Sequence, residues 1–391
     1  MKKNIVMLST ENEFENYRLY KDSGLITYYL GKEYNYNSIF FCCNSSKILP
    51  SNFRNMKIIE KKLTLKSCGI FSMYRGFEIK RYIFLIKNIK NIDFLLIFQF
   101  SRHKILFIFL YKLLNKKGKI YIKLDATLEY IKRSNKNNER LIDKFSNFFI
   151  KKALNKVDLF SCETKECFEK IKTEGLWHLN IANKIIYIPN GFDEDYLIEN
   201  NIKVKKFEEK ENIMITVGRI GTEEKNNEML LKVINKMDLK DWKIYIIGPY
   251  TEQFKRYYDD FIKSNPAKKD KVILVGNIED KNLLYDYYNR AKVFLFTSKW
   301  ESFGIVLSEA LRFGNYIITT DVGAAKDITN NGEIGVVTEI ENEEQYKNEI
   351  LKVINKEINL EEKYNQSLKW CEEKFLWNNI VKHEKFKIFF S

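Results

Sequence analysis

The stretch Val293–Asp321 reads VFLFTSKWESFGIVLSEALRFGNYIITTD and carries the clearest structural pattern in the chain. Its apolar run Val293–Phe296 is typical of a buried parallel strand. The polar loop Thr297–Glu301 leaves the carboxyl end of that strand, and the β-rich run Tyr316–Thr320 follows a helical pattern. The stretch therefore predicts one α/β unit: a strand, a loop, a helix and a second strand.

The helix of this unit is expected to begin near Ser302 or Phe303, because the serine side chain can cap the first turn. Gly314 is placed to end the helix, since glycine readily adopts the left-handed conformation that closes many helices. The buried face is expected to contain four apolar residues at helical spacing: Ile305, Leu307, Ala310 and Leu311.

Two carboxylates flank the predicted helix start, Glu301 in the loop and Glu309 eight residues later in the helix. The free N–H groups around Phe303, Gly304 and Ile305 would form an anion site, and Gly304 lets a ligand approach the backbone. A nucleotide sugar has a matching layout, because its diphosphate lies between a ribose and a hexose. The alternative is that both carboxylates are solvated surface charges, as most glutamates are.

The same stretch resembles the Glu-x7-Glu signature of the retaining glycosyltransferases of family four (glycosyl transferases group 1), which have the GT-B fold. The residues that carry the resemblance are Ser298, Glu301, Phe303, Gly304, Glu309, Ala310 and Gly314. In that family the second Glu binds the ribose, the first contacts the transferred sugar, and backbone N–H groups hold the phosphates. The resemblance implies these roles for Glu309, Glu301 and the amides of Phe303, Gly304 and Ile305.

Two cations follow the predicted strand Ile213–Val217, namely Arg219 at the strand end and Lys225 at the next helix start. Together they could neutralise a diphosphate and stabilise a leaving group, although both could also be surface charges in so basic a chain. The Val-Gly-Arg…Lys-Asn pattern resembles the donor-phosphate pair of the same family. The resemblance further places the loop after Gly276 near the nucleotide base, so Asn277 and Ile278 are candidate base contacts.

Alternating apolar runs and helical patterns continue through the rest of the chain and predict parallel sheets covered on both faces. The further runs expected to be strands are Asn4–Ser9, Ser38–Cys43, Met56–Lys61, Phe94–Phe98, Lys119–Leu124, Leu159–Cys162, Ile185–Ile188, Trp242–Ile247 and Val272–Val275. Helical patterns cover Gly24–Glu33, Phe77–Ile89, His103–Asn115 and Asn138–Leu154. The fold class is therefore α/β, and the resemblance makes it GT-B, with two Rossmann-like doubly wound domains around a central cleft.

A length of 391 residues leaves room for two domains of ordinary size. The turn signal Pro-Asn-Gly in Ile186–Asp193 resembles the segment that closes the N-terminal domain in this family, which places the boundary near Asp195. The closing stretch Ser367–Ile388 resembles the helix that relatives return across both domains. The expected divisions are an acceptor-binding domain over 1–195, a nucleotide-sugar-binding domain over 196–370, and a returning C-terminal helix over 371–391.

Three residues of the N-terminal half are further candidates. Gly24 lies where the family has a Gly-rich turn near the donor phosphates, although Asp22 or Ser23 could simply cap a helix there. Asp125 ends a predicted strand, where active-site residues collect, and is a candidate for orienting the acceptor. His103 opens a predicted helix, where it could either line the cleft or cap the helix and cover a surface.

A net charge of +14 raises three classes of partner: nucleic acid, an anionic membrane, or a polyanionic substrate. No nucleic-acid-binding signature is present, so we expect no nucleic acid. The segment Phe100–Lys117 mixes apolar and basic residues and predicts either an interfacial helix on an anionic leaflet or a core-facing helix with extended lysines. No signal peptide or membrane span is expected, which indicates a cytoplasmic location, peripheral on the inner face of the cell membrane if the interfacial helix is correct.

These observations lead to one functional prediction. The chain is expected to be a retaining glycosyltransferase that uses a nucleotide-diphosphate sugar, a UDP-sugar, and acts on a glycan, glycolipid or protein-linked acceptor in bacterial-type surface polysaccharide or glycoconjugate synthesis. No Asp-x-Asp motif is present, and the resemblance implies no cofactor or metal. The alternatives are a nucleotide-sugar epimerase or hydrolase on the same fold, and a non-catalytic subunit that binds a membrane or a partner. The sugar, base, acceptor and oligomeric state stay open.

Overall fold

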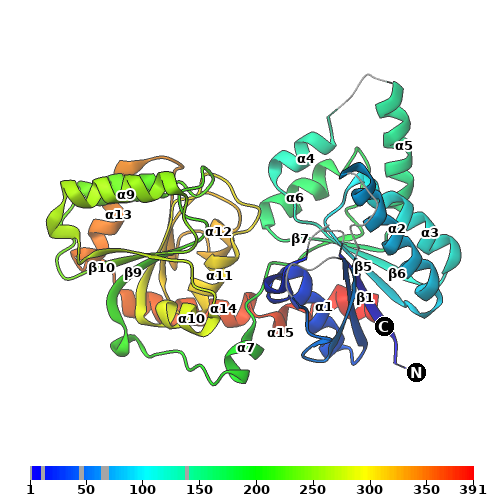
Figure 1. The fold of residues 1–391 in the computed structure, drawn as a ribbon, viewed down its shortest axis with the longest axis horizontal. Helices are drawn as coiled ribbons and strands as arrows, with labels where there is room; N and C mark the ends of the chain where they lie inside the picture. Colours follow the sequence, from blue (N-terminus) through cyan, green and yellow to red (C-terminus); the bar gives the residue numbers. More distant parts are fainter. Residues whose placement is uncertain (1, 10–13, 44–47, 63–69, 137–140) are drawn as a thin grey trace. The chain divides into compact units, whose positions relative to one another are not determined.

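A computed structural model describes the whole chain except residues 1, 10–13, 44–47, 63–69 and 137–140. The chain divides into two compact units. The first unit contains residues 1–189 and 377–391, and the second contains residues 190–376. Each unit is built around one sheet with helices on both faces (Figure 1).

The first unit contains a sheet of eight strands. Their bounds are β1 Asn4–Leu8, β2 Asn37–Cys43, β3 Asn52–Phe53, β4 Met56–Lys61, β5 Phe94–Phe98, β6 Lys119–Lys123, β7 Leu159–Cys162 and β8 Ile185–Tyr187. The order across the sheet is β3-β4-β2-β1-β5-β6-β7-β8, and every neighbouring pair is parallel except β3 with β4. The chain therefore builds outward from β1 in both directions, which is the pattern of a doubly wound sheet.

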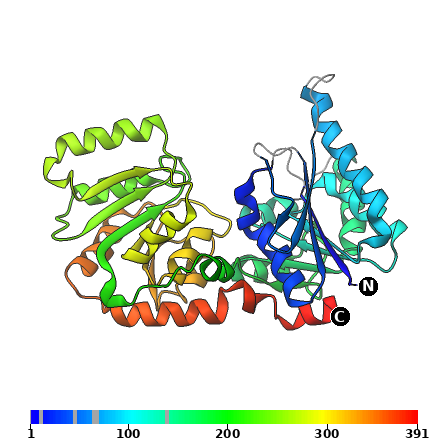
Figure 2. The same ribbon diagram turned by 60° about the horizontal axis from the view of Figure 1, so that its bottom comes forward.

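Helices cover both faces of this sheet. Their bounds are α1 Asp22–Glu33, α2 Ile70–Asn88, α3 Ile105–Leu114, α4 Leu128–Ser134, α5 Leu141–Asn155, α6 Lys165–Glu174, α15 Trp377–Ile380 and α16 Glu384–Phe390, with short 3-10 turns at Asn16–Tyr20, Ile89–Asn91 and Arg102–Lys104. One core is shared by α1, α15 and α16, and the other by α2 to α6. Figure 2 shows α1 and the C-terminal helices on one side of the blue strands, with α2 and α3 on the other.

The second unit contains a sheet of six strands that are all parallel. Their bounds are β9 Glu211–Val217, β10 Lys243–Ile247, β11 Val272–Gly276, β12 Ala291–Phe296, β13 Tyr316–Thr320 and β14 Gly335–Thr338. The order is β11-β10-β9-β12-β13-β14. The direction of winding reverses between β9 and β12. In open α/β sheets a ligand crevice forms at such a reversal, outside the carboxyl ends of the strands.

The helices of the second unit also divide between two faces. Their bounds are α7 Glu194–Glu199, α8 Asn227–Asn235, α9 Glu252–Ser264, α10 Lys281–Arg290, α11 Ile305–Arg312, α12 Ala325–Ile328, α13 Glu343–Ile354 and α14 Leu360–Lys374, with 3-10 turns at Phe207–Glu209 and Pro266–Lys268. One core is shared by α8, α9 and α13, and the other by α7, α10, α11, α12 and α14.

The predicted α/β class and the alternation of strands and helices are confirmed. Four predicted strands have the observed bounds: Met56–Lys61, Phe94–Phe98, Leu159–Cys162 and Tyr316–Thr320. Two strands had no prediction, the two-residue β3 and the edge strand β14. Part of the predicted helix Asn138–Leu154 lies outside the described residues, and its described part begins at Leu141.

The boundary between the units lies at Pro189, earlier than the predicted position near Asp195. The turn after Pro189 belongs to the second unit, because the Phe192 N–H donates to the Phe375 carbonyl at 2.6 Å. Helix α7 is fixed to the same unit, since Glu194 accepts two hydrogen bonds of 2.6 Å from Arg312. The contacts that set the boundary are thus long-range in sequence, and no local signal marks them.

The closing segment is three helices and not the single helix predicted over Ser367–Ile388. Helix α14 ends at Lys374 and belongs to the second unit, whereas residues 377–391 belong to the first. Trp377 anchors the returning segment, because its fully buried ring stacks on Tyr29 of α1 with centroids 6.5 Å apart. The returning part therefore begins at 377, later than the predicted 371.

Candidate active site

The predicted donor residues of the second unit gather at the reversal of its sheet. Arg219 follows β9, and Glu301 follows β12, which is the strand paired with β9 in parallel. Because parallel strands end at the same edge, the two loops are brought to one place. Helix α11, labelled in Figure 1, starts from the second of these loops and carries Glu309.

Lys225 and Glu301 form an ion pair at this edge, although they lie 76 residues apart in sequence. Both side chains are largely buried, with 15% and 14% of their surface exposed. The Ser298 hydroxyl donates to the same carboxylate oxygen at 2.9 Å, and the Thr297 hydroxyl donates to the Lys225 carbonyl at 2.9 Å. The pair is thus held from both loops, in a position where its charges are only partly screened.

Arg219 is far more open, with 69% of its side chain exposed, and its guanidinium pairs with Glu224. The Glu224 carbonyl also accepts from the Lys299 N–H at 2.7 Å, which ties this loop to the loop after β12. No signal in the sequence had singled out Glu224. Both predicted phosphate-binding cations therefore carry a carboxylate partner in this structure.

The start of α11 differs from the prediction. The helix begins at Ile305 with Gly304 as its N-cap, and Ser302 does not cap it. Gly304 has φ of +85°, a left-handed conformation that a residue with a Cβ rarely adopts, and this turn moves the helix start past Ser302. The first amides of α11 have no acceptor within the helix, so they remain a potential anion site.

The end of α11 agrees with the prediction. Gly314 has φ of +66° and follows the last helical turn. Its N–H donates to the Leu311 carbonyl at 3.0 Å, and the Asn315 N–H donates to the Ala310 carbonyl at 3.0 Å. These two bonds form a Schellman motif, for which glycine is the usual residue.

Glu309 is fixed by a residue that the sequence did not indicate. The Tyr288 hydroxyl of α10 donates to the Glu309 carboxylate at 3.0 Å. Burial raises the pKa of Tyr288 well above its usual value, and the charge of Glu309 raises it further. The phenol therefore stays protonated and keeps donating, which orients the carboxylate.

The two candidate base contacts follow β11. Asn277 is exposed, whereas Ile278 packs against the apolar core that α10 and α11 share. They leave the same edge of the sheet as the loop of Arg219, since β11, β10 and β9 are parallel neighbours. Their place is compatible with the predicted role, and their contact with a base stays a prediction.

Gly24 lies inside the first turn of α1 and not in a turn that precedes it. It is buried, and an added Cβ would lie 2.3 Å from the Leu19 carbonyl oxygen, so packing alone requires glycine here. Neither Asp22 nor Ser23 is the N-cap, a position held by Lys21. His103 is exposed in the 3-10 turn before α3.

Asp125 belongs to a cluster of charged groups at the carboxyl ends of β6 and β7. The Gln99 amide donates to Asp125 at 2.7 Å. Lys123, 1% exposed, lies 3.1 Å from a carboxylate oxygen of fully buried Glu163 and 4.0 Å from Asp22. Only Asp125 had been predicted, because the other charges are spread over 142 positions of the sequence and only the sheet brings them together.

The charges of this cluster shift one another. Burial raises the pKa of Glu163 well above its usual value near 4.5, the charge of Lys123 lowers it, and Asp125 raises it further. Burial alone would lower the pKa of Lys123, but the carboxylates of Glu163 and Asp22 raise it above its usual value. Lys123 therefore keeps its charge in the native protein, and this charge opposes the effect of burial on Glu163.

In the part of the chain that the structure describes, no cluster of metal ligands marks a second centre. No group of three His, Cys, Asp or Glu side chains there could hold a metal ion. A hollow of about 580 Å³ is lined by residues of α14 and of the loop after α12, including Trp370 and Glu333. None of the predicted site residues lines it.

Several known proteins resemble this chain in sequence or in fold. Residues 198–369 match the family model of the glycosyl transferases group 1. A probable sucrose-phosphate synthase of Thermosipho melanesiensis is 26% identical over 52% of this chain and 46% of its own length. The capsular polysaccharide biosynthesis glycosyltransferase CapM of Staphylococcus aureus is 26% identical over 51% of this chain and 55% of its own length. The chain thus spans about half the length of each of these curated relatives.

A solved structure extends the likeness to both units. The structure of Anabaena HepE in complex with UDP and glucose superposes with a TM-score of 0.65, covers 99% of each chain, and is 13% identical. At this identity the likeness concerns the fold, which is GT-B.

Proposed function

We propose that this chain, whose residues 198–369 match the family model of the glycosyl transferases group 1, is a retaining, nucleotide-sugar-dependent hexosyltransferase. The donor would be a UDP-sugar, as a UDP complex exists for the similar HepE fold. The acceptor would be a glycan, a glycolipid or a protein-linked group, in surface polysaccharide or glycoconjugate synthesis. The similarity to the capsular enzyme CapM supports this class of acceptor.

One observation carries the proposal. The Lys225–Glu301 pair lies at the reversal of the six-stranded sheet, in the same loop system that leads into the start of α11. A cation, a carboxylate and unpaired helix amides then lie together at the one edge where open α/β sheets bind ligands. Ordinary surface ion pairs are exposed to solvent, whereas the side chains of this pair are only 15% and 14% exposed.

The roles of the donor residues follow from charge. Arg219, Lys225 and the amides at Phe303, Gly304 and Ile305 would hold the diphosphate, since all of them present N–H groups. Glu309, oriented by Tyr288, would accept from the ribose hydroxyls, and Glu301 from the hydroxyls of the transferred sugar. Asn277 and Ile278 would contact the base.

The rate would come mainly from stabilising the leaving diphosphate as negative charge develops on it. Lys225 and Arg219 would supply the positive charge that opposes it, and the acceptor would attack from the face that the leaving group occupies. Glu301 need not form a covalent intermediate, and no metal or other cofactor is required in this proposal. Asp125 would orient the acceptor hydroxyl from the first unit.

A screen of nucleotide sugars tests the donor site. With EDTA present, the preferred donor should raise the melting temperature of the unaltered protein and be hydrolysed slowly in the absence of acceptor. Arg219→Ala and Glu309→Ala should each weaken donor binding about tenfold, since each removes one charged hydrogen-bonding group. Isothermal titration at about 0.15 M salt measures the affinities.

The controls separate the proposal from its alternatives. Arg290→Ala removes an arginine that pairs with Glu211 away from the predicted site, and it should leave donor affinity unchanged. If the best donor binds Arg219→Ala and Glu309→Ala as tightly as the unaltered protein, the site assignment is wrong. If the donor changes without acceptor at the full rate of turnover, an epimerase or hydrolase replaces the transferase.

A further inference from the structure

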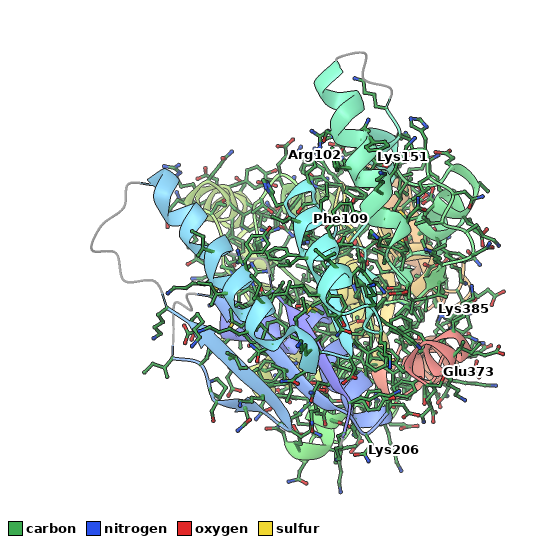
Figure 3. All side chains as sticks on the ribbon, turned by 90° about the vertical axis from the view of Figure 1, so that its right-hand side faces the viewer. Arg102, Phe109, Lys151, Lys206, Glu373 and Lys385 are labelled. Atoms are coloured by element: carbon green, nitrogen blue, oxygen red, sulfur yellow. The ribbon has the colours of Figure 1, made fainter. Side chains whose placement is uncertain are left out.

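Helices α2, α3 and α5 form one continuous surface of the first unit (Figure 3). Tyr82 of α2 stacks on Phe107 of α3 with ring centroids 4.2 Å apart. The Lys156 ammonium, just after α5, lies 5.9 Å from the ring of Phe109 on α3. We call this surface the three-helix face and define it by residues 79–90, 102–117 and 146–156.

Apolar side chains are concentrated on the outside of this face. Eight of the eighteen large apolar side chains that are exposed in the described part of the chain lie on it. Ile79, Ile83 and Ile86 follow one another at helical spacing on α2, each about half exposed. Leu113 on α3 is 70% exposed. Single exposed apolar residues are ordinary, but a group on three adjoining helices marks an interaction surface.

Helix α3 shows why these residues do not serve the fold. Phe107, Ile108 and Tyr111 already bury one side of it against the sheet. Leu106 and Leu113, seven residues apart, lie on the opposite side and are exposed. A surface helix normally carries polar residues there. The core-facing alternative drawn from the sequence therefore holds for one side of this helix, and its other side is open.

The charge of the same face has a single sign. Its three segments contain twelve lysine or arginine residues and no aspartate or glutamate. The chain as a whole has 66 basic and 52 acidic residues, so the absence of acidic residues is particular to these three segments. Arg81 and Lys104 are buried and Lys112 pairs with Asp158, but Lys87, Lys116 and Lys117 are exposed beside the apolar residues.

We propose that the three-helix face binds the surface of an anionic lipid leaflet. Apolar side chains ringed by lysines match the acyl boundary and the phosphate headgroups of such a surface. In the described residues no helix is both long and apolar enough to cross a membrane, so the contact would be interfacial. The proposal is independent of the donor site, since lipid binding requires no nucleotide sugar.

Vesicle flotation with the full chain tests the proposal. The protein should float with phosphatidylcholine vesicles that contain phosphatidylglycerol, float much less with pure phosphatidylcholine, and be released by high salt. Lys116→Glu with Lys117→Glu should lower the partition coefficient at least about 25-fold, since each basic residue near an anionic leaflet contributes about fivefold. Leu113→Ser should lower it about fivefold to tenfold.

Matched controls come from the same unit. Ile388 is 66% exposed, close to Leu113, and lies off the three-helix face, so Ile388→Ser should bind vesicles as the unaltered protein does. Lys382→Glu with Lys385→Glu is the control for charge, because both lysines are exposed on or beside α16. Urea midpoints of all variants should match the unaltered protein, which shows that surface binding alone has changed.

Three results would overturn the proposal. Equal binding to neutral and anionic vesicles, or none to either, removes the lipid surface as the partner. An equal loss in the control variants removes the three-helix face as the site. A dimer in light scattering that Leu113→Ser dissociates, without vesicle binding, would assign the face to a second copy of the chain. Sugar transfer to a water-soluble acceptor should persist in every variant of the three-helix face. Failure of the lipid-binding proposal can therefore be distinguished from failure of the proposed function.

Discussion

Lys225→Ala is expected to lower the turnover number of sugar transfer by about 10²- to 10³-fold, the effect of removing one group that stabilises developing charge. Lys225 is the buried cation of the site, and it would face the leaving diphosphate. Its loss also leaves the Glu301 carboxylate with the Ser298 hydroxyl, at 2.9 Å, as its remaining hydrogen-bond donor among the described residues. Release of UDP under saturating donor and acceptor measures the turnover number.

Glu301→Gln, alone and combined with Lys225→Ala, tests whether the two residues act together. Because the two groups form one ion pair, their effects should not add, and the double variant should be close to the worse single variant. Lys232→Ala is the control, since this lysine of α8 is 53% exposed and pairs with Glu343. Activity of Lys225→Ala within about threefold of the unaltered protein would remove Lys225 from the reaction.

Lys123→Met is expected to lower the free energy of unfolding by about 3–5 kcal/mol, the cost of removing one partner from a buried ion pair. Lys123 is 1% exposed, and its ammonium lies between Glu163 and Asp22. Without it, carboxylates that are shielded from water lose their counter-charge. Urea unfolding followed by circular dichroism measures the change.

Two variants test whether charge is the cause. Lys112→Met breaks a pair with Asp158 whose side chains are 15% and 35% exposed, and it should cost only about 1 kcal/mol. Lys123→Met combined with Glu163→Gln should be more stable than Lys123→Met alone, because it also removes a buried carboxylate. If the double variant is the less stable one, lost packing and not an unpaired charge explains the effect.

Local signals in the sequence were sufficient for most of the strands and for the end of α11. Runs such as Phe94–Phe98 and Leu159–Cys162 were predicted with their observed bounds, because buried parallel strands are continuously apolar. Gly314 was predicted correctly because a left-handed residue at the end of a helix is a local requirement that glycine commonly meets. The start of α11 was not, since the left-handed turn at Gly304 overrode the capping preference of Ser302.

In the N-terminal half, the sequence indicated only one member of the buried charged cluster. Asp125 could be suggested because it ends a strand, but Lys123 and Glu163 read as ordinary residues of two separate segments. Pairing of β6 with β7 brings them within 3.1 Å and excludes water from both. The same holds for Tyr288, whose hydroxyl reaches Glu309 only because α10 and α11 pack on one face of the sheet.

By itself the sequence determined the fold class, the order of most elements, the family likeness and the residue types of the donor site, because these depend on patterns within about thirty neighbouring positions. The tertiary structure alone decided which charges meet. It joined Lys225 to Glu301 across 76 positions, moved the boundary between the units to Pro189, and left apolar residues of α2, α3 and α5 exposed on one face. Burial and ion pairing depend on distances between segments, which a linear order of residues does not contain.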